Sequence, residues 1–228
     1  MTDRIALAAR NNALWCDAVC RSHGLSTVLD DLVWTSRTRT PPYYPDAVTL
    51  SRVTTEYDVL ARIDPGDGAS VKDSWSRFDL TTEDFARLVV GEWLWFDVPE
   101  TGADGRAWRR IEATEFPAWA SAWARDPEDA AILRAGLLDE PGVHVLAATD
   151  GDDSFAAGAI VNVTAPVAGI SNTFSRDADE VRTWRGATRA AHQLVGTMPF
   201  VSWEAGDGVM AAVEAGAERL GPLTVWIS

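Results

Sequence analysis

The feature that most constrains this chain is the regular order of its elements from Ala107 to Ser228. Short runs of β-branched and alternating apolar residues are interleaved there with longer runs of helical periodicity. The pattern predicts a strand, two helices, three strands, and then a helix, a strand, a helix and a strand. These segments read AWRRIEA, FPAWASAWAR, EDAAILRAGLL, GVHVLAAT, FAAGAIVNV, AGISNTF, ADEVRTWRGATRAAHQLV, PFVSWEA, DGVMAAVEAGAERL and PLTVWIS. Such an order favours an α/β (α+β) domain in which helices cover a sheet.

The first half of the chain, residues 1–100, predicts a further α+β unit. Helices are expected from Ile5 to His23, from Leu25 to Trp34 and, with a threonine cap, from Thr54 to Ile63. A proline-rich loop, TSRTRTPPYYPD, follows the second helix. The runs ASVKDSWSRFDL and ARLVVGEWLWFDV are expected to pair as a hairpin. The segment ETGADGR then predicts a linker to a domain of residues 106–228.

The composition excludes several classes of partner and compartment. A formal net charge of −14 disfavours nucleic acid and anionic membranes as partners. The first residues, Met1–Ala13, lack the apolar core of a signal peptide, and no run is long enough to span a membrane. Two cysteines without a framework of pairs fit a reducing compartment. We therefore expect a cytoplasmic protein, and the sequence leaves a homodimer open. The single lysine, Lys72, among nineteen arginines is interpreted as codon bias of a GC-rich genome.

The element order from Trp108 to Ser228 resembles that of the GCN5-related N-acetyltransferase (GNAT) superfamily. The closing segment VMAAVEAGAERLGPLTVWIS is similar to the superfamily's last helix, aliphatic–glycine pair and terminal strand. The stretches ARNNALWCDAVCRSHG and TPPYYPDAVTL are similar to GNAT-related bacterial proteins. The resemblance implies a mixed, mostly antiparallel twisted sheet flanked by helices. For residues 1–100 it leaves two alternatives, namely strands that join this sheet or a smaller, degenerate copy of the fold.

The resemblance also implies where a co-substrate binds. The superfamily holds acyl-CoA where its fourth and fifth strands part, which here are AGISNTF and FVSWEA. No metal is implied. The backbone of the first of these strands would line the pantetheine cleft, through Ile170, Ser171, Asn172, Thr173 and Phe174.

The expected diphosphate loop departs from the superfamily's pattern. Its nearest match is RTWRGA, which makes Arg182, Arg185 and Gly186 the candidate residues, but Arg185 stands where the first glycine is usual. An acidic run, Asp177 to Glu180, precedes this segment. These acids are either helix caps beside a site that binds no diphosphate, or neighbours of two arginine side chains that replace the missing backbone amides.

Acyl transfer to an amine requires a base, and often an acid for the departing thiolate. Glu204 closes the strand FVSWEA beside the expected cleft and is the candidate base, the alternative being an ordinary surface carboxylate at a strand end. No tyrosine follows Tyr57, so a phenolic acid must come from Tyr43 or Tyr44 in the proline-rich loop. The alternative is that these two rings only pack the loop onto the domain.

Two functions follow, and the sequence leaves both open. The resemblance implies an enzyme that transfers an acetyl or other acyl group from acyl-CoA to an amine of a small molecule or protein. The acidic loop and the missing late tyrosine instead favour a non-catalytic binding or regulatory protein with the same scaffold. A third class, an acidic protein that binds a basic partner, fits the charge alone. Cys16, Cys20 and His23 can share one helical face, but they lack a fourth ligand for a structural metal.

Overall fold

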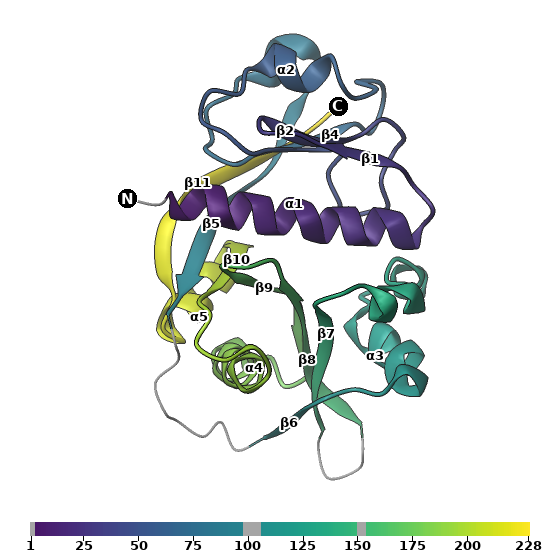
Figure 1. The fold of residues 1–228 in the computed structure, drawn as a ribbon, viewed down its shortest axis with the longest axis vertical. Helices are drawn as coiled ribbons and strands as arrows, with labels where there is room; N and C mark the ends of the chain where they lie inside the picture. The colour runs from purple at the N-terminus through teal and green to yellow at the C-terminus, as the bar shows by residue number, and fades with distance from the viewer. Residues whose placement is uncertain (1–2, 98–105, 150–153) are drawn as a thin grey trace.

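The computed structural model describes residues 3–97, 106–149 and 154–228. Its strands form one sheet in the order β1-β2-β3-β4-β11-β5-β10-β9-β8-β7-β6 (Figure 1). The strands are β1 (Thr27–Leu29), β2 (Val33–Ser36), β3 (Ala47–Thr49), β4 (Ser70–Asp73), β5 (Ala86–Phe96), β6 (Ala107–Arg110), β7 (Val143–Thr149), β8 (Phe155–Val163), β9 (Ala168–Ser175), β10 (Phe200–Ala205) and β11 (Glu218–Ile227). The helices are α1 (Arg4–Ser22), α2 (Glu56–Leu60), α3 (Phe116–Trp123), α4 (Glu180–Val195) and α5 (Asp207–Glu214).

The sheet is mixed and mostly antiparallel, with parallel pairs at β3–β4 and β9–β10. The predicted fold class is therefore confirmed. Strands from residues 1–100 join the sheet of the second half, the first of the two alternatives. The linker expected at residues 100–106 lies almost entirely outside the described residues, and the domain division stays a prediction.

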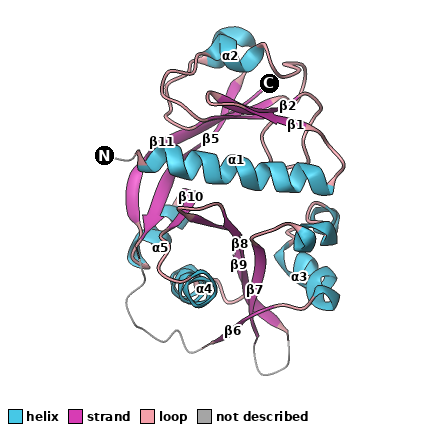
Figure 2. Ribbon diagram, viewed as in Figure 1, coloured by secondary structure: helices cyan, strands magenta, loops and turns pink. Residues whose placement is uncertain are grey.

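Helices cover both faces of the sheet (Figure 2). On one face, α1 and α3 pack on a core that includes Trp15, Trp93 and Trp119. On the other, α4 and α5 pack on a second core, where Trp184 stacks on Phe96 at 5.3 Å between ring centroids. A third core lies between α2 and the strands of the first half.

The helix α1 crosses the middle of the molecule and contacts β3, β5, β9, β10 and β11 (Figure 1). It begins at an N-cap, because the Asp3 side chain accepts hydrogen bonds from the backbone amides of Ile5 and Ala6. Its small residues Ala8, Ala9 and Ala13 are fully buried, which lets the helix approach the sheet closely. The helix therefore joins the strands of both halves on one face.

Three expectations for local structure are wrong. The segment Leu25–Trp34 is not a helix but contains β1 and the start of β2, because the Asp30 side chain accepts from the amides of Leu32 and Val33 and closes a turn between them. The segment EDAAILRAGLL forms 3₁₀ turns at Pro127–Ala131 and Ala135–Asp139 instead of a helix.

The third concerns the expected hairpin. In ASVKDSWSRFDL only Ser70–Asp73 is strand, because the Asp73 carboxylate accepts from the amides of Trp75, Arg77 and Phe78 and turns the chain. The strands β4 and β5 do not pair, since β11 lies between them: Thr224 faces Asp73 on one side and Val90 on the other. The other predicted helices and strands are present, with shifted ends.

Candidate functional site

The strands β9 and β10 part soon after they meet. Their parallel pairing is limited to two residue pairs, Phe200 with Ala168 and Val201 with Gly169. A β-bulge in β9 accompanies the separation, because Phe174 pairs with Gly158 while Ser171 pairs with Ile160, which leaves one extra residue in β9. Asn172, within the bulge, has a φ of 52°. The bulge bends β9 away from β10 and opens a V between them.

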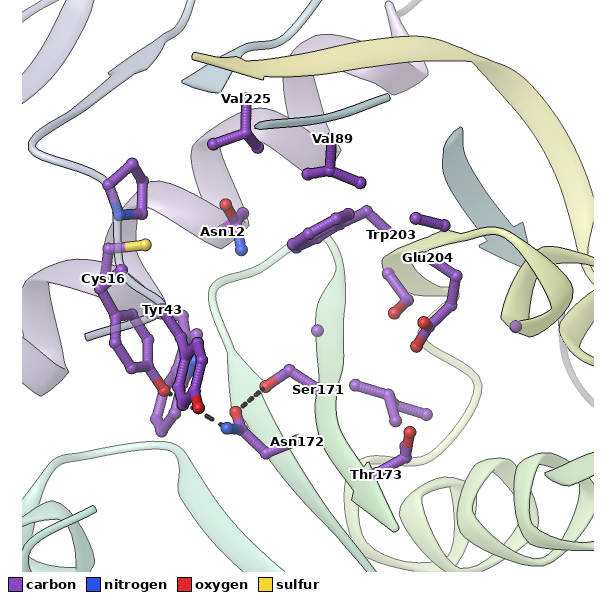
Figure 3. Close-up of a pocket in the computed structure, with 18 of the residues that line it drawn as sticks. Asn12, Cys16, Tyr43, Val89, Ser171, Asn172, Thr173, Trp203, Glu204 and Val225 are labelled. Atoms are coloured by element: carbon purple, nitrogen blue, oxygen red, sulfur yellow. Dashed lines mark hydrogen bonds between the residues drawn. The ribbon is translucent and has the colours of Figure 1, made fainter. Parts of the chain in front are cut away.

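A cavity of about 1160 Å³ occupies this opening (Figure 3). Its walls come from α1, the proline-rich loop, β4, β5, β9, β10 and β11. It therefore spans both halves of the chain.

All five predicted residues of β9 line the cavity: Ile170, Ser171, Asn172, Thr173 and Phe174. Figure 3 shows the side chains of Ser171, Asn172 and Thr173 in its wall. The Ser171 hydroxyl donates to Asn172 Oδ1 at 3.0 Å. Ile170 is buried in the core under α4, and Phe174 packs edge-on against Trp119 at 5.5 Å. Three polar side chains in this wall thus lie between two apolar ones.

Glu204, the candidate base, lies on the opposite wall, at the end of β10 (Figure 3). The pKa of its carboxyl is raised from 4.5 to about 7, mainly by burial and also by the nearby charge of Glu180, while Arg125 opposes both effects. Gly208 in α5 leaves room for the carboxylate, because a Cβ there would lie 2.9 Å from Glu204 Oε2. A carboxyl group with a pKa near 7 can exchange protons at neutral pH.

The two candidate acids differ in their surroundings. Tyr43 is 64% exposed at the rim and donates to the carboxylate of Asp129, which raises the pKa of the phenol. Tyr44 is buried, which also raises its pKa, and its hydroxyl oxygen accepts from Asn172 Nδ2 at 3.3 Å and from Trp15. Among the described residues no acceptor takes the hydroxyl hydrogen of Tyr44. That hydrogen is left for a group in the cavity.

The structure was compared with solved structures. It is similar to a GCN5-related N-acetyltransferase from Kribbella flavida over 97% of this chain and 95% of that one, with a TM-score of 0.64 and 14% identity. It is also similar to a putative GNAT-family acetyltransferase from Novosphingobium aromaticivorans over 96% of this chain and 98% of that one, with a TM-score of 0.55 and 10% identity. The chain has the GNAT fold. No protein-family model and no curated protein matches the sequence.

A third similar structure is that of a protein of unknown function. It is a functionally unknown conserved protein from Staphylococcus epidermidis, similar over 71% of this chain and 72% of that one, with a TM-score of 0.56 and 9% identity. At such low identities the likeness concerns the fold alone. Activity has to be argued from the residues of this chain.

The candidate diphosphate residues do not line the cavity between β9 and β10. Arg182, Arg185 and Gly186 lie inside α4 and are not among the residues that line the opening. Arg185 donates to the backbone oxygen of Glu214 at 3.0 Å, and Arg182 lies 3.7 Å from Asp177. Their role in binding diphosphate stays a prediction.

The turn before α4 uses its own carboxylates as hydrogen-bond acceptors. Asp177 accepts from the Asp179 amide at 3.1 Å, from the Ser175 hydroxyl at 2.7 Å and from Arg106. Asp179 caps the helix by accepting from the Arg182 amide at 2.9 Å. The contacts to Arg106 and Ser175 keep the pKa of Asp177 far below its usual range. The amides of Asp179 and Arg182, at the helix start where an anion would bind, thus already have acceptors from the chain.

Sequence reasoning missed three groups in the cavity wall: Asn12 of α1, Lys72 of β4 and Trp203 of β10. Of these three, Lys72 alone has a signal in the sequence, namely the rarity of lysine, which is interpreted above as codon bias. Cys16 also lines the cavity, but burial raises the pKa of its thiol to about 11, so it stays protonated at neutral pH. In the described ranges, no group of three or more His, Cys, Asp or Glu residues is placed to bind a metal ion. Within the same ranges, none of the helices has the length and apolar character required to cross a bilayer.

Proposed function

We propose that this chain is an N-acyltransferase that moves an acyl group from an acyl-CoA thioester to the amine of a small molecule or protein. The observation that carries the proposal is the V between β9 and β10, whose cavity has Glu204 on one wall and the β9 bulge on the other. An extended pantetheine arm can lie along such an opening and hydrogen-bond to strand backbone. The bulge favours this, because it leaves part of β9 outside the ladder.

Glu204 serves as the base in this proposal. The amine nitrogen forms a bond to the thioester carbonyl carbon, the C–S bond breaks, and the proton of the amine passes to the Glu204 carboxylate. A base is most effective when its pKa is close to the working pH, and burial brings Glu204 to about 7.

Tyr44 serves as the acid. Its raised pKa keeps the phenol protonated, and hydrogen bonds from Asn172 and Trp15 to its oxygen leave the hydroxyl hydrogen free to transfer to the departing thiolate. Tyr43 is exposed at the rim, away from the departing thiolate, and its hydroxyl already donates to Asp129. Tyr43 is therefore assigned to the rim.

The test is release of free thiol from acetyl-CoA in the presence of a panel of amines. We expect amine-dependent thiol release with a midpoint near pH 7 in the pH profile of kcat/KM, because only the ionised carboxylate accepts a proton, and a further rise at the higher pH where the free amine loses its own proton. Glu204→Gln should lower kcat by about 10²–10⁴-fold and abolish the midpoint near pH 7. Equal activity of Glu204→Gln and the wild type would overturn the role of Glu204.

A second candidate function is favoured by the turn before α4. Because Asp177 and Asp179 accept hydrogen bonds from backbone amides at the helix start, a diphosphate would meet fewer donors there and two negative charges. The candidate is a binding or regulatory protein that keeps the GNAT scaffold without acyl-CoA. Calorimetric titration with acetyl-CoA and with acetyl-pantetheine separates the two functions. Binding of either one supports the transferase, whereas no heat from both at millimolar concentration supports the non-catalytic protein.

A further inference from the structure

Lys72 is the single lysine of the chain, and it lies in the wall of the cavity. It belongs to β4, where it pairs with Val48 on one side and Val225 on the other. Only 3% of its surface is exposed. A lysine is rarely buried to this extent unless a partner or ligand meets its charge.

The partners of Lys72 within the chain are uncharged. Nζ donates to Asn12 Oδ1 at 2.9 Å and lies 4.2 Å from the ring centroid of Trp203. In the part of the chain that the structure describes, no carboxylate forms an ion pair with it. Burial lowers the pKa of Lys72 to about 8, so most of the population is still protonated at pH 7. A buried ammonium without a counter-charge is expensive, and an anion in the cavity would supply that charge.

Asn12 provides a second donor beside Lys72. An ammonium group can only donate, so the hydrogen bond fixes the Asn12 amide with its oxygen toward Lys72. The Asn12 Nδ2 group then points elsewhere, and none of the described residues accepts from it. Figure 3 shows Asn12 on the wall opposite Ser171 and Asn172. Lys72 and Asn12 therefore offer two adjacent donors, which match the two oxygens of a carboxylate.

The surroundings of these donors suit a small organic molecule. Val89, Val225 and the indole of Trp203 form an apolar wall beside them (Figure 3). Glu204 follows Trp203 in β10, and the two side chains line the same cavity. A molecule whose anionic end meets Lys72 therefore extends past Trp203 toward the opening where Glu204 lies.

We propose that Lys72 and Asn12 bind the carboxylate of the acceptor, so that the substrate is a small amine that carries a carboxylate, such as an amino acid. The assignment of the amine as acceptor rests on the proposed acyltransferase function; the carboxylate site rests only on the two donors. The apolar wall of Val89, Val225 and Trp203 would hold the carbon skeleton between the two ends.

The test uses the single lysine as its own reporter. Protein labelled with ¹³C at the lysine ε-carbon gives one ε-methylene cross-peak, which is titrated with each of the twenty amino acids and with phosphoethanolamine. The controls are the amine or amide that corresponds to each amino acid but lacks the carboxylate. We expect at least one amino acid to shift the Lys72 peak saturably, and its carboxylate-free counterpart to bind at least tenfold more weakly.

Variants test the same site by calorimetry. Lys72→Met should weaken binding of that amino acid at least tenfold and leave the weak binding of its carboxylate-free counterpart unchanged. Arg52→Met is the matched control, because Arg52 also lies over an indole, that of Trp75, but outside the cavity lining. It should bind like the wild type. If Lys72→Met does not fold, Asn12→Leu and the wild-type titration still decide the question.

The outcomes separate this inference from the proposed function. A saturable, carboxylate-dependent shift without acyl transfer supports the anion site and counts against the enzyme. Acyl transfer to amines without a carboxylate that is equally fast in Lys72→Met overturns the anion site and leaves the enzyme. A Lys72 peak that none of the amino acids moves, or that only phosphoethanolamine moves, also overturns the proposal.

Discussion

At the scale of single residues, the cavity holds two ionisable groups whose pKa values burial shifts in opposite directions, with the neutral form favoured in both. The Glu204 carboxyl is pushed toward its neutral form, with a pKa of about 7, and the Lys72 ammonium is pushed the same way, with a pKa of about 8. Neither group forms an ion pair among the described residues. Groups whose charged forms are destabilised in a cleft are candidates for function, because a bound ligand of opposite charge can stabilise the charged form.

The raised pKa of Glu204 predicts how the stability of the protein changes with pH. Its pKa in the folded state lies above the unfolded value of about 4.5, so the folded state binds more protons between those values. The neutral carboxyl therefore contributes stability below pH 4.5 that is lost as pH rises past about 7. Glu204→Gln, which stays neutral, should exceed the wild type in free energy of unfolding by about 1–3 kcal/mol at pH 8 and match it at pH 4.

Urea denaturation at the two pH values measures this difference. Glu128→Gln is the control, since Glu128 is an exposed glutamate, and it should not differ from the wild type at either pH. A Glu204→Gln protein that is equally destabilised at both pH values would show that the carboxylate is held by interactions other than those described.

The burial of Lys72 without a carboxylate partner among the described residues predicts how its replacement changes the stability of the protein. Replacing it by methionine keeps most of the apolar stem and removes an ammonium that no carboxylate balances, so Lys72→Met should be as stable as the wild type or more stable by about 1 kcal/mol at pH 7. Thermal unfolding followed by circular dichroism measures this. A loss of several kcal/mol would mean that the charge contributes to folding, and would weaken the case for an external anion.

At the scale of elements, the junction of α1 with β8 and β9 supports one side of the cavity. The Asn11 side chain donates to the Asn162 backbone oxygen at 3.0 Å and to Thr164 Oγ1 at 2.8 Å, and Asn162 Nδ2 donates to the backbone oxygen of Asn11 at 3.2 Å. Gly169 leaves room for both amides, because a Cβ there would lie 2.1 Å from Asn11 Oδ1 and 2.3 Å from Asn162 Oδ1. The helix is thus joined to the strand at the point where the V begins.

Gly169→Ala should therefore break this network. We expect a loss of about 1–3 kcal/mol in the free energy of unfolding from overpacking, together with weaker ligand binding, because α1 carries Asn12 into the cavity. Gly136→Ala is the control, since a Cβ there meets nothing within 4 Å. Urea denaturation of both variants provides the measurement. Unchanged stability of Gly169→Ala would contradict the close approach of α1 to β9.

The elements also show how far the sequence could be interpreted. Periodicity predicted α1, α4 and the strands β7 to β10, because each of these is long enough for its apolar pattern to be read locally. It failed at Leu25–Trp34, where a single aspartate side chain closes a turn inside an apolar run. It also failed for the partners of β4 and β5, since pairing across more than one hundred residues leaves no local pattern.

The candidate site was predictable to the same degree. The resemblance directed attention to the strands on either side of the V and to Glu204, which all line the cavity. The contributions of α1 and β4 were not predictable, because Asn12 and Lys72 reach the cavity only through the long-range packing of the first half on the second. The rarity of lysine marked Lys72, but rarity alone does not indicate where a side chain lies.

At the scale of the whole molecule, one strand of the first half lies inside the sheet of the second half. β5 comes from the first half, yet it pairs with β10 on one edge and β11 on the other, both from the second half. We therefore expect a single cooperative unfolding transition in urea, with tryptophan fluorescence and circular dichroism coincident. Two separate transitions would contradict this, as would a folded fragment of residues 1–97.

The position of β5 also has a consequence during synthesis. When β5 leaves the ribosome, neither strand that will flank it has been made: β10 (Phe200–Ala205) is translated much later, and β11 (Glu218–Ile227) later still. Its exposed residues Leu88 and Val90 lie in a β-rich, apolar stretch of the kind that self-associates when unpaired. The nascent chain therefore spends a large part of its translation with both edges of β5 unpaired, and we expect chaperones that bind such edges to raise its yield in a cell.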